Sequence, residues 1–282
     1  MIQYGINTFL WASPFQTKHL RLLGKIKEQG FDLAEIPIES IGDVDFDKAA
    51  AAFARAGLGA SVCAVMGASR DPSHPDAEIQ RNGIEYLKHC TDGVAAFGGS
   101  VLGGPLFSAV GRQWQQTPAM RKRDLARTAK NLGIAADYAA RKNVRFALEP
   151  LNRFETSFIN VMEQALELVE LVGRPNVGVM IDTFHANIEE KRLGKAIEMA
   201  GGKLFHVHAN ENDRGTPGTG HVNWAEVAAA LKKIDYSGAL VIESFSTEVK
   251  EIARAAAIWR PPAPTQDSLS TEGIAYLKKL MA

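Results

Sequence analysis

The sequence predicts an α/β protein built as a single closed (β/α)8 barrel, the TIM-barrel architecture. Short apolar runs alternate with longer segments of helical period along the 282 residues, and this strand–helix unit occurs eight times. No linker, low-complexity block or strong repeat divides the chain. Repeated strand–helix units are typical of a parallel sheet covered by helices. We therefore expect one catalytic domain over residues 1–282.

Each expected strand is short, apolar and bounded by Gly, Pro, Asn or a charged residue, as buried parallel strands are. In chain order the expected strands are Gln3–Thr8, Phe31–Ile36, Ala60–Met66, Ser100–Leu106, Val144–Glu149, Val177–Asp182, Leu204–His208 and Ala239–Glu243. An open doubly wound sheet is the alternative for this pattern. That fold usually has a glycine fingerprint after its first strand, and none follows Gln3–Thr8.

The segments between the strands have the 3.6-residue period of amphipathic helices. Arg121–Arg141 shows one apolar stripe, and a last helix is expected near Leu269–Leu280, after the proline-rich connection at 260–264. The stripe comprises Leu125, Ala129, Leu132, Ala136 and Ala139. Gly57 and Gly173 stand where helix C-termini are expected.

Two helix starts are predicted from capping boxes. Asn160 precedes Glu163 by three residues, and Asn223 has the same relation to Glu226. In a capping box the first side chain accepts from the backbone N–H three residues on, whose own side chain reaches back.

The composition disfavours several classes of function. Lys and Arg number 32 and Asp and Glu 32, so no net field attracts nucleic acid or an anionic membrane. Cys63 and Cys90 have neither metal-type nor redox-type spacing, which suits a reducing cytoplasm. The N-terminus lacks signal-peptide features, and no run of 18 apolar residues occurs. We expect a cytoplasmic protein that acts on a small molecule.

Four titratable residues end the last four expected strands. These are Glu149, Asp182, His208 and Glu243. Reactive groups of such barrels come from the C-terminal ends of strands, so all four should point into one mouth.

Three ionised carboxylates in a low-dielectric site repel one another, and a divalent cation removes that difficulty. Oxygen-rich ligation with one imidazole and no thiolate favours Mn²⁺, Mg²⁺ or Co²⁺ over a structural Zn²⁺. The competing interpretation is that each acid only caps a helix or pairs with a surface lysine. Four consecutive strand ends favour the metal site.

Polar and aromatic residues after the strands are candidates for substrate binding. They are Glu155, His185, Arg214, Phe245, Trp11 and Trp114. The two tryptophans follow strands one and four, where they serve as aromatic walls or as packing residues. The loop after strand seven offers Glu211 and the glycine-rich stretch Gly215–Gly220, which we interpret as a mobile loop carrying Arg214, with phosphate binding as the alternative.

Taken together, these residues resemble the ketose 3-epimerases (D-tagatose, D-allulose and L-ribulose 3-epimerases) of the xylose-isomerase-like barrel superfamily. The resemblance covers essentially the whole chain. The matching segments are EPLNRFE at 149–155, IDTFHANIEE at 181–190, His208 with Arg214, ESFS at 243–246 and IWR at 258–260.

The resemblance implies a role for each matching residue. Glu149, Asp182, His208 and Glu243 match metal ligands, usually of Mn²⁺ or Co²⁺, and the two glutamates also match the catalytic acid/base pair. Positions that contact substrate match Glu155, His185 and Arg214. The implied reaction is metal-dependent epimerisation at C3 of a free ketose through an enediolate, and the implied assembly is a homodimer or homotetramer.

Other functions stay open at this point. An aldose–ketose isomerase, or another sugar or sugar-phosphate isomerase, would use the same metal and acids. A glycoside hydrolase would use Glu149 and Glu243 alone and leave Asp182 and His208 without a purpose. A phosphodiesterase acting on damaged DNA would need more histidines and a basic face. A sugar-binding module would gain nothing from two acid/base groups.

Overall fold

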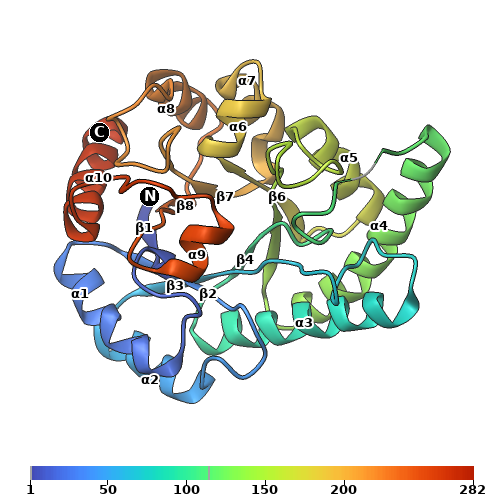
Figure 1. Cartoon of the computed structure of the whole chain (residues 1–282), viewed down its shortest axis with the longest axis horizontal. Helices are drawn as coiled ribbons and strands as arrows, with labels where there is room; N and C mark the ends of the chain where they lie inside the picture. The colour runs from blue at the N-terminus through green and yellow to red at the C-terminus, as the bar shows by residue number, and fades with distance from the viewer. Residues whose placement is uncertain (1, 114) are drawn as a thin grey trace.

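The computed structural model describes residues 2–113 and 115–282. Eight parallel strands form a closed barrel in sequence order, since β1 pairs with both β2 and β8 (Figure 1). The strands are β1 Gln3–Asn7, β2 Leu33–Pro37, β3 Gly59–Cys63, β4 Val101–Gly104, β5 Arg145–Leu148, β6 Val177–Asp182, β7 Leu204–His208 and β8 Ala239–Ile242. The predicted barrel is confirmed, and the open sheet is excluded.

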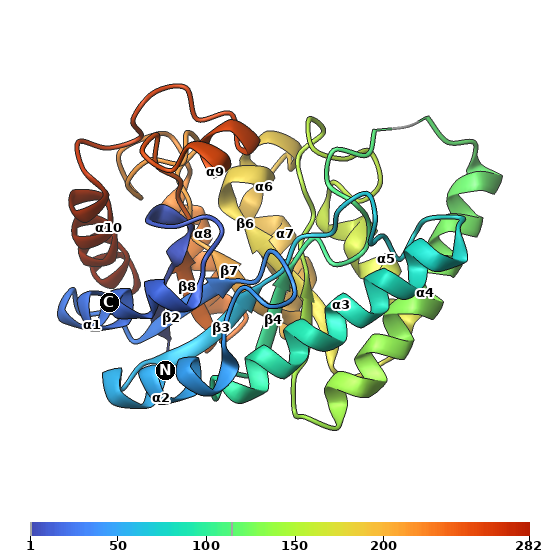
Figure 2. The same ribbon diagram turned by 60° about the horizontal axis from the view of Figure 1, so that its bottom comes forward.

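Helices surround the barrel, and Figure 2 shows α6 and α9 above the strands. The α-helices are α1 Leu22–Glu28, α2 Phe46–Ala56, α3 Ala77–Ala96, α4 Pro118–Ala140, α5 Met162–Val172, α6 Thr183–Glu189, α7 Leu193–Ala200, α8 Trp224–Lys233, α9 Lys250–Ala255 and α10 Gln266–Met281. Three short 3-10 helices are η1 Thr8–Leu10, η2 Thr17–Arg21 and η3 Gly201–Lys203. Within residues 2–113 and 115–282, no helix has both the length and the apolar character needed to cross a membrane.

The core lies between the strands and the helices around them. The predicted stripe of α4 is buried at all five positions, from Leu125 to Ala139. The C-terminal helix α10 packs on β1 and β8, where the two ends of the sheet meet. The helix predicted at Leu269–Leu280 therefore covers the closure of the barrel.

The predicted capping box of Asn160 and Glu163 is wrong. Helix α5 begins at Met162, with Val161 as its N-cap. The Asn160 side chain instead donates to two backbone carbonyls of the loop after β5. The side chain of Gln164 accepts from the backbone N–H groups of Asn160 at 2.8 Å and Val161 at 3.4 Å. The cap is one residue later in the sequence than predicted, because the asparagine serves the loop.

The other helix-end predictions agree better with the structure. Asn223 caps α8 by accepting from the backbone N–H of Glu226 at 3.2 Å. The Glu226 carboxylate returns to the Asn223 side chain, at 3.3 Å, rather than to its backbone. Gly57 and Gly173 both have φ of 61°, the left-handed conformation expected after α2 and α5.

The two candidate caps of α5 can be separated by mutation. Replacing Gln164 with Ala removes the acceptor for two N–H groups, so the free energy of unfolding should fall by about 1 kcal/mol. The control Glu163→Ala removes an exposed side chain and should lower it by about 0.5 kcal/mol or less. Urea unfolding measures both. A larger loss in Glu163→Ala would restore the capping box that the sequence suggests.

Candidate functional site

The structure brings the four strand-end residues together. Glu149 follows β5, Asp182 and His208 end β6 and β7, and Glu243 follows β8. All four are buried, and one ligand-type atom from each lies within 4.8 Å of the others. Convergence at one mouth of the barrel is therefore an observed feature of the fold.

Strand register and one asparagine fix this arrangement. Asp182 and His208 are register partners on β6 and β7. Asn210, two residues past His208, donates from its side chain to Asp182 Oδ1 at 2.9 Å. The side-chain oxygen of Asn210 accepts from the backbone N–H of Glu243 at 2.7 Å. Asn210 thus connects the ends of β6 and β8 across β7, a role that no sequence pattern indicated.

A cavity of about 140 Å³ opens beside this cluster. Its polar lining consists of Glu149, Glu155, His185, Arg214 and Glu243. Its apolar lining includes Phe9, Val65, Pro105, Val110, Leu151 and Phe245. The cavity therefore combines charged and apolar lining residues, as a site for a small polar molecule with a carbon face should.

The aromatic residues divide between this cavity and the core. Phe245 lines the cavity together with Phe9, their ring centroids 5.7 Å apart. Trp11 instead packs against the core under the Lys25 ammonium group, and it is not among the described residues that line the cavity. An aromatic wall is present, but Phe9 takes the place predicted for Trp11. Trp114 lies outside the described residues.

Arg214 is buried between acids of the cluster. Its Nη1 donates to Asp182 Oδ2 at 2.7 Å and to Glu243 Oε2 at 3.1 Å, and its Nη2 lies 3.3 Å from His185 Nε2. Burial works against the charge of Asp182, but Arg214 and the neighbouring histidines hold the pKa of this carboxyl below its usual range. The guanidinium therefore keeps Asp182 ionised.

His185 and Glu155 are held by one backbone turn after β5. His185 Nδ1 accepts from the backbone N–H of Asn152 at 3.2 Å, and the Asn152 side chain donates to Glu155 Oε1 at 2.8 Å. Burial lowers the pKa of His185, so its ring is neutral near pH 7. Both predicted residues line the cavity, with Glu155 at its more open side.

Glu149 has the least compensated charge in the cluster. Burial raises the pKa of Glu149 well above its usual range; His208 opposes this shift, while Asp182 and Glu243 add to it. Glu149 Oε1 lies 3.7 Å from His208 Nδ1, and within the described part of the chain neither buried atom has a hydrogen-bond partner. Two unpartnered ligand-type atoms facing one space fit a cation.

The donor set is also that of a hard divalent cation. Three carboxylates and one imidazole converge. Cys63 is nearby, with Sγ 4.0 Å from Glu243 Oε1, but it is not part of this four-residue group. Burial and the neighbouring acids raise the pKa of the Cys63 thiol well above its usual range, so it stays protonated. Such oxygen-rich sites suit Mn²⁺, Mg²⁺ or Co²⁺.

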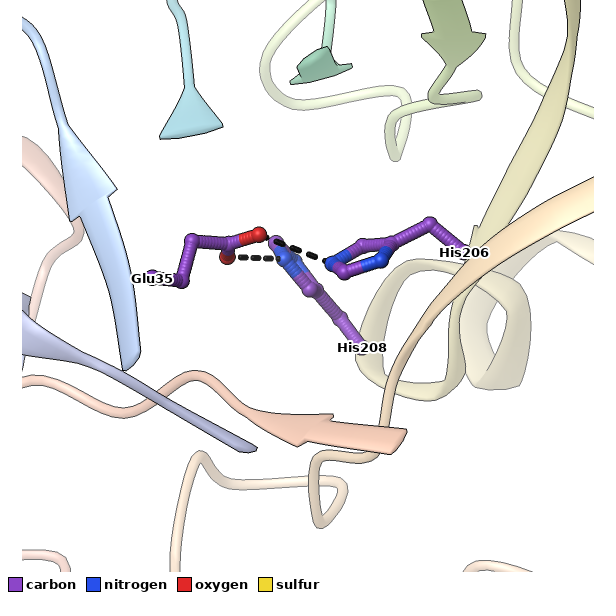
Figure 3. Close-up of side chains that lie close together, drawn as sticks. All are labelled: Glu35, His206 and His208. Atoms are coloured by element: carbon purple, nitrogen blue, oxygen red, sulfur yellow. Dashed lines mark hydrogen bonds and ion pairs between the residues drawn. The ribbon is translucent and has the colours of Figure 1, made fainter. Parts of the chain in front are cut away.

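Sequence reasoning missed the layer below the cluster. Glu35 of β2 reaches across the barrel to His206 and His208 of β7 (Figure 3). Burial opposes ionisation of Glu35, but the two histidines hold its pKa well below the usual range. Two signals were present: a carboxylate inside an apolar strand, and a histidine two residues before His208, on the same strand face.

The loop after β7 is anchored rather than free. Glu211 is fully buried, and its carboxylate accepts from the backbone N–H groups of Gly218 at 2.8 Å and Val222 at 2.9 Å, and from Trp224 Nε1 at 2.8 Å. The expectation of a mobile glycine-rich loop is thereby corrected. Glu211 fixes the loop that positions Arg214, and its oxygens are not directed into the cavity.

Comparisons with known proteins find similarity over almost the whole chain. The family model for the xylose isomerase-like TIM barrel matches residues 23–280. A probable ketose 3-epimerase of Synechocystis is 32% identical over 278 residues, which cover 99% of this chain and 96% of that protein. An L-ribulose 3-epimerase of Mesorhizobium japonicum is 34% identical over 263 residues, covering 92% and 88%.

A solved structure agrees with these sequence comparisons. The D-allulose 3-epimerase of Methylomonas sp., in complex with D-allulose, superimposes with a TM-score of 0.92 at 32% identity, covering 99% of this chain and 96% of that one. The chain therefore belongs to the xylose isomerase-like TIM barrel family and, within it, to the ketose 3-epimerases, which are enzymes of the isomerase class.

Proposed function

We propose that this protein is a divalent-metal-dependent epimerase acting at C3 of a free ketose, such as D-tagatose, D-fructose, D-allulose or L-ribulose. The observation that carries the proposal is the position of Glu149 and Glu243. They follow β5 and β8, and both line the cavity of about 140 Å³ beside the four-residue cluster. The D-allulose complex of the Methylomonas relative supports a ketose as substrate.

Glu149, Asp182, His208 and Glu243 would hold the metal, with Mn²⁺ favoured and Co²⁺ or Mg²⁺ as alternatives. A divalent cation supplies Lewis-acid stabilisation of negative charge on substrate oxygens and fixes their orientation. The unpartnered atoms of Glu149 and His208 support this assignment.

Epimerisation requires one group to take the C3 proton and another to return a proton on the opposite face. Two carboxylates flanking the substrate perform both steps as general base and general acid, and they exchange roles in the reverse reaction. Glu149 and Glu243 both line the cavity, and we assign these two roles to them. Burial raises the pKa of Glu149, which favours its protonated form.

The remaining polar lining would orient the sugar. Arg214 would donate to substrate oxygens next to the reacting carbon, His185 would donate to or accept from them, and Glu155 would accept from a hydroxyl. Phe9 and Phe245 cover the carbon face and exclude water from the carboxylates. Pairing of Arg214 with two acids already fixes the guanidinium before substrate enters.

The charge of the cavity favours a free sugar over a sugar phosphate. Among its described lining residues, Arg214 is the one lysine or arginine, and it is already paired with Asp182 and Glu243. A phosphate dianion would meet Glu149, Glu155 and Glu243 without an unpaired lysine or arginine among the described lining residues to bind it. A neutral ketose has no such cost.

We also propose one catalytic domain in a cytoplasmic homodimer or homotetramer. The exposed Phe154 and Trp259, with 71% and 82% of their surfaces accessible, supply apolar surface for subunit contact. Neither a nucleic acid nor a membrane is proposed as a partner, because charge is balanced over the chain.

A panel of ketoses in deuterated water with Mn²⁺ tests the reaction. We expect deuterium to enter C3 of the substrate and its epimer, read by NMR. Deuterium at C1 or C2 with formation of an aldose would instead identify an aldose–ketose isomerase. Absence of exchange at any carbon in every ketose would contradict the proposed function.

Removing either acid/base group should stop turnover. Glu149→Gln and Glu243→Gln, each saturated with Mn²⁺, should lower kcat by about 100- to 10,000-fold, the usual contribution of such a group. The surface variant Glu163→Gln should match the wild type. Thermal melting checks that each variant is folded. Near-normal turnover in a folded, metal-loaded variant would remove that residue from the pair.

Metal removal provides an independent check. Dialysis against a chelator should abolish epimerisation, and added Mn²⁺ or Co²⁺ should restore it. The reason is that a bound divalent cation would stabilise negative charge on the substrate oxygens. Metal content is verified by elemental analysis at each stage. Full activity of verified metal-free protein would contradict the metal proposal and favour a reaction that uses only the two glutamates.

A further inference from the structure

Glu35 lies inside the barrel, in a position that the proposed reaction does not use directly. It is fully buried, and its two oxygens face four polar side chains. Asn7 Nδ2 donates to Oε1 at 2.9 Å, and His208 Nε2 lies 2.7 Å from the same oxygen. Ser61 donates to Oε2 at 2.8 Å, and His206 Nε2 lies 2.8 Å from it (Figure 3).

This arrangement follows from the strand register. Asn7, Glu35 and Ser61 are register partners on the adjacent strands β1, β2 and β3. His206 and His208 are two residues apart on β7, so both rings point to the same face of the strand. The carboxylate is therefore placed by three strands on one side of the barrel and meets two imidazoles from the other side.

The partners of Glu35 indicate which nitrogen of His208 carries a proton. Oε1 of Glu35 accepts from Asn7 and Oε2 accepts from Ser61, so both oxygens are acceptors and the nitrogen that contacts Oε1 is the donor. That nitrogen is Nε2 of His208. Its other ring nitrogen, Nδ1, lies 3.4 Å from Glu243 Oε2 and 3.7 Å from Glu149 Oε1, on the side of the four-residue cluster.

We propose that Glu35 is a positioning residue that keeps the proton of His208 on Nε2 and turns the Nδ1 lone pair toward the site shared with Glu149, Asp182 and Glu243. The inference rests on the proposed metal dependence. A carboxylate that accepts from the distal nitrogen of a ligating histidine fixes its tautomer and its ring orientation.

The same contacts connect Glu35 to one of the acid/base groups. Asn7 Nδ2 lies 2.9 Å from Glu35 Oε1 and 3.3 Å from Glu243 Oε1. A single amide group therefore holds Glu35 and Glu243 at a fixed separation. Movement of Glu35 would displace both His208 and Glu243.

A second cation among Glu35, His206 and His208 is the competing interpretation, because the three offer ligand-type atoms close together. His208 Nε2 makes a hydrogen bond with Glu35 Oε1 at 2.7 Å, whereas His206 Nε2 lies 2.8 Å from Oε2 and has no hydrogen-bond partner among the described residues. Asn7 and Ser61 also donate to the same carboxylate, which uses the lone pairs that a cation would need. None of the three residues is among the described lining of the cavity. A proton-mediated role is therefore favoured.

Calorimetric titration of metal-free protein with Mn²⁺ tests the proposal. Glu35→Gln replaces one acceptor oxygen by an amide donor and removes the charge. Its Mn²⁺ affinity should fall by about 10- to 100-fold, the usual effect of losing such a partner. The matched control Ser61→Ala removes a donor to the other oxygen but keeps the carboxylate, and it should stay within about threefold of the wild type. Thermal melting of the metal-free variants reports folding.

A spectroscopic measurement separates positioning from a purely structural role. Long-range ¹H–¹⁵N NMR of histidine-labelled wild-type protein saturated with Mg²⁺ should place the His208 proton on Nε2. In Glu35→Gln at saturating Mg²⁺, the Nε2 proton resonance should shift and exchange faster with solvent. A residue that only stabilised the fold would lower the melting temperature without this change. The wild-type spectrum tests the proposal even if the variant fails to fold.

The outcomes that would overturn the inference are distinct from those that would overturn the proposed function. Equal Mn²⁺ affinity in Glu35→Gln and wild type, or a wild-type His208 proton on Nδ1, would overturn the positioning role alone. A second Mn²⁺ that His206→Gln abolishes would show that the cluster itself binds a cation. Wild-type protein that binds no divalent metal would overturn the proposed metal site, and this inference with it.

Discussion

The proximity of three buried carboxylates is the constraint on which the rest of the site depends. Glu149, Asp182 and Glu243 lie within 4.8 Å of one another through one oxygen each, in a part of the barrel with little access to water. Like charges at this separation are costly at low dielectric, so positive partners must be held equally rigidly. Arg214 supplies one such partner, and His208 faces the space that a second would occupy. Arg214 must stay beside these acids to balance their charge. Glu211 meets this requirement by anchoring the loop after β7 that carries Arg214.

Much of this site could be predicted from the sequence because it depends on where apolar runs end. Asp182 and His208 are the last residues of their strands, and Glu149 and Glu243 come one residue after theirs. Parallel strands of a barrel point the same way, so residues at consecutive ends meet whatever the details of the loops. The fold was predictable for the same reason, since eight strand–helix units leave few topologies.

The parts that could not be predicted depend on contacts between distant segments. Glu35 and His208 are 173 positions apart, and only closure of the barrel brings them together. The cap of α5 was misplaced because Asn160 had a competing bond partner in the loop before it. For Trp11 the residue type leaves both a wall and a packing role open, and the contact with the core and with Lys25 that decides for packing is formed only in the folded chain. In each case the residue type suggested a polar or aromatic role, but the residue that it contacts could not be identified from the neighbouring sequence.

Hydrogen bonding distinguishes Glu149 from the two buried carboxylates that support the fold, Glu35 and Glu211. Glu211 accepts from three backbone N–H groups and one indole, and Glu35 is surrounded by Asn7, Ser61 and two histidines. Both have a pKa below the usual range and accept hydrogen bonds on both oxygens, which holds the groups around them in place. Glu149 is equally buried, yet Oε1 has no hydrogen-bond partner among the described residues, and its pKa is raised. A buried acid without a partner destabilises the protein, and its retention beside a cavity is best explained by chemistry that needs a free oxygen. The barrel thus uses saturated carboxylates to hold its loops and rings in place, so that an unsaturated one can be kept at the mouth.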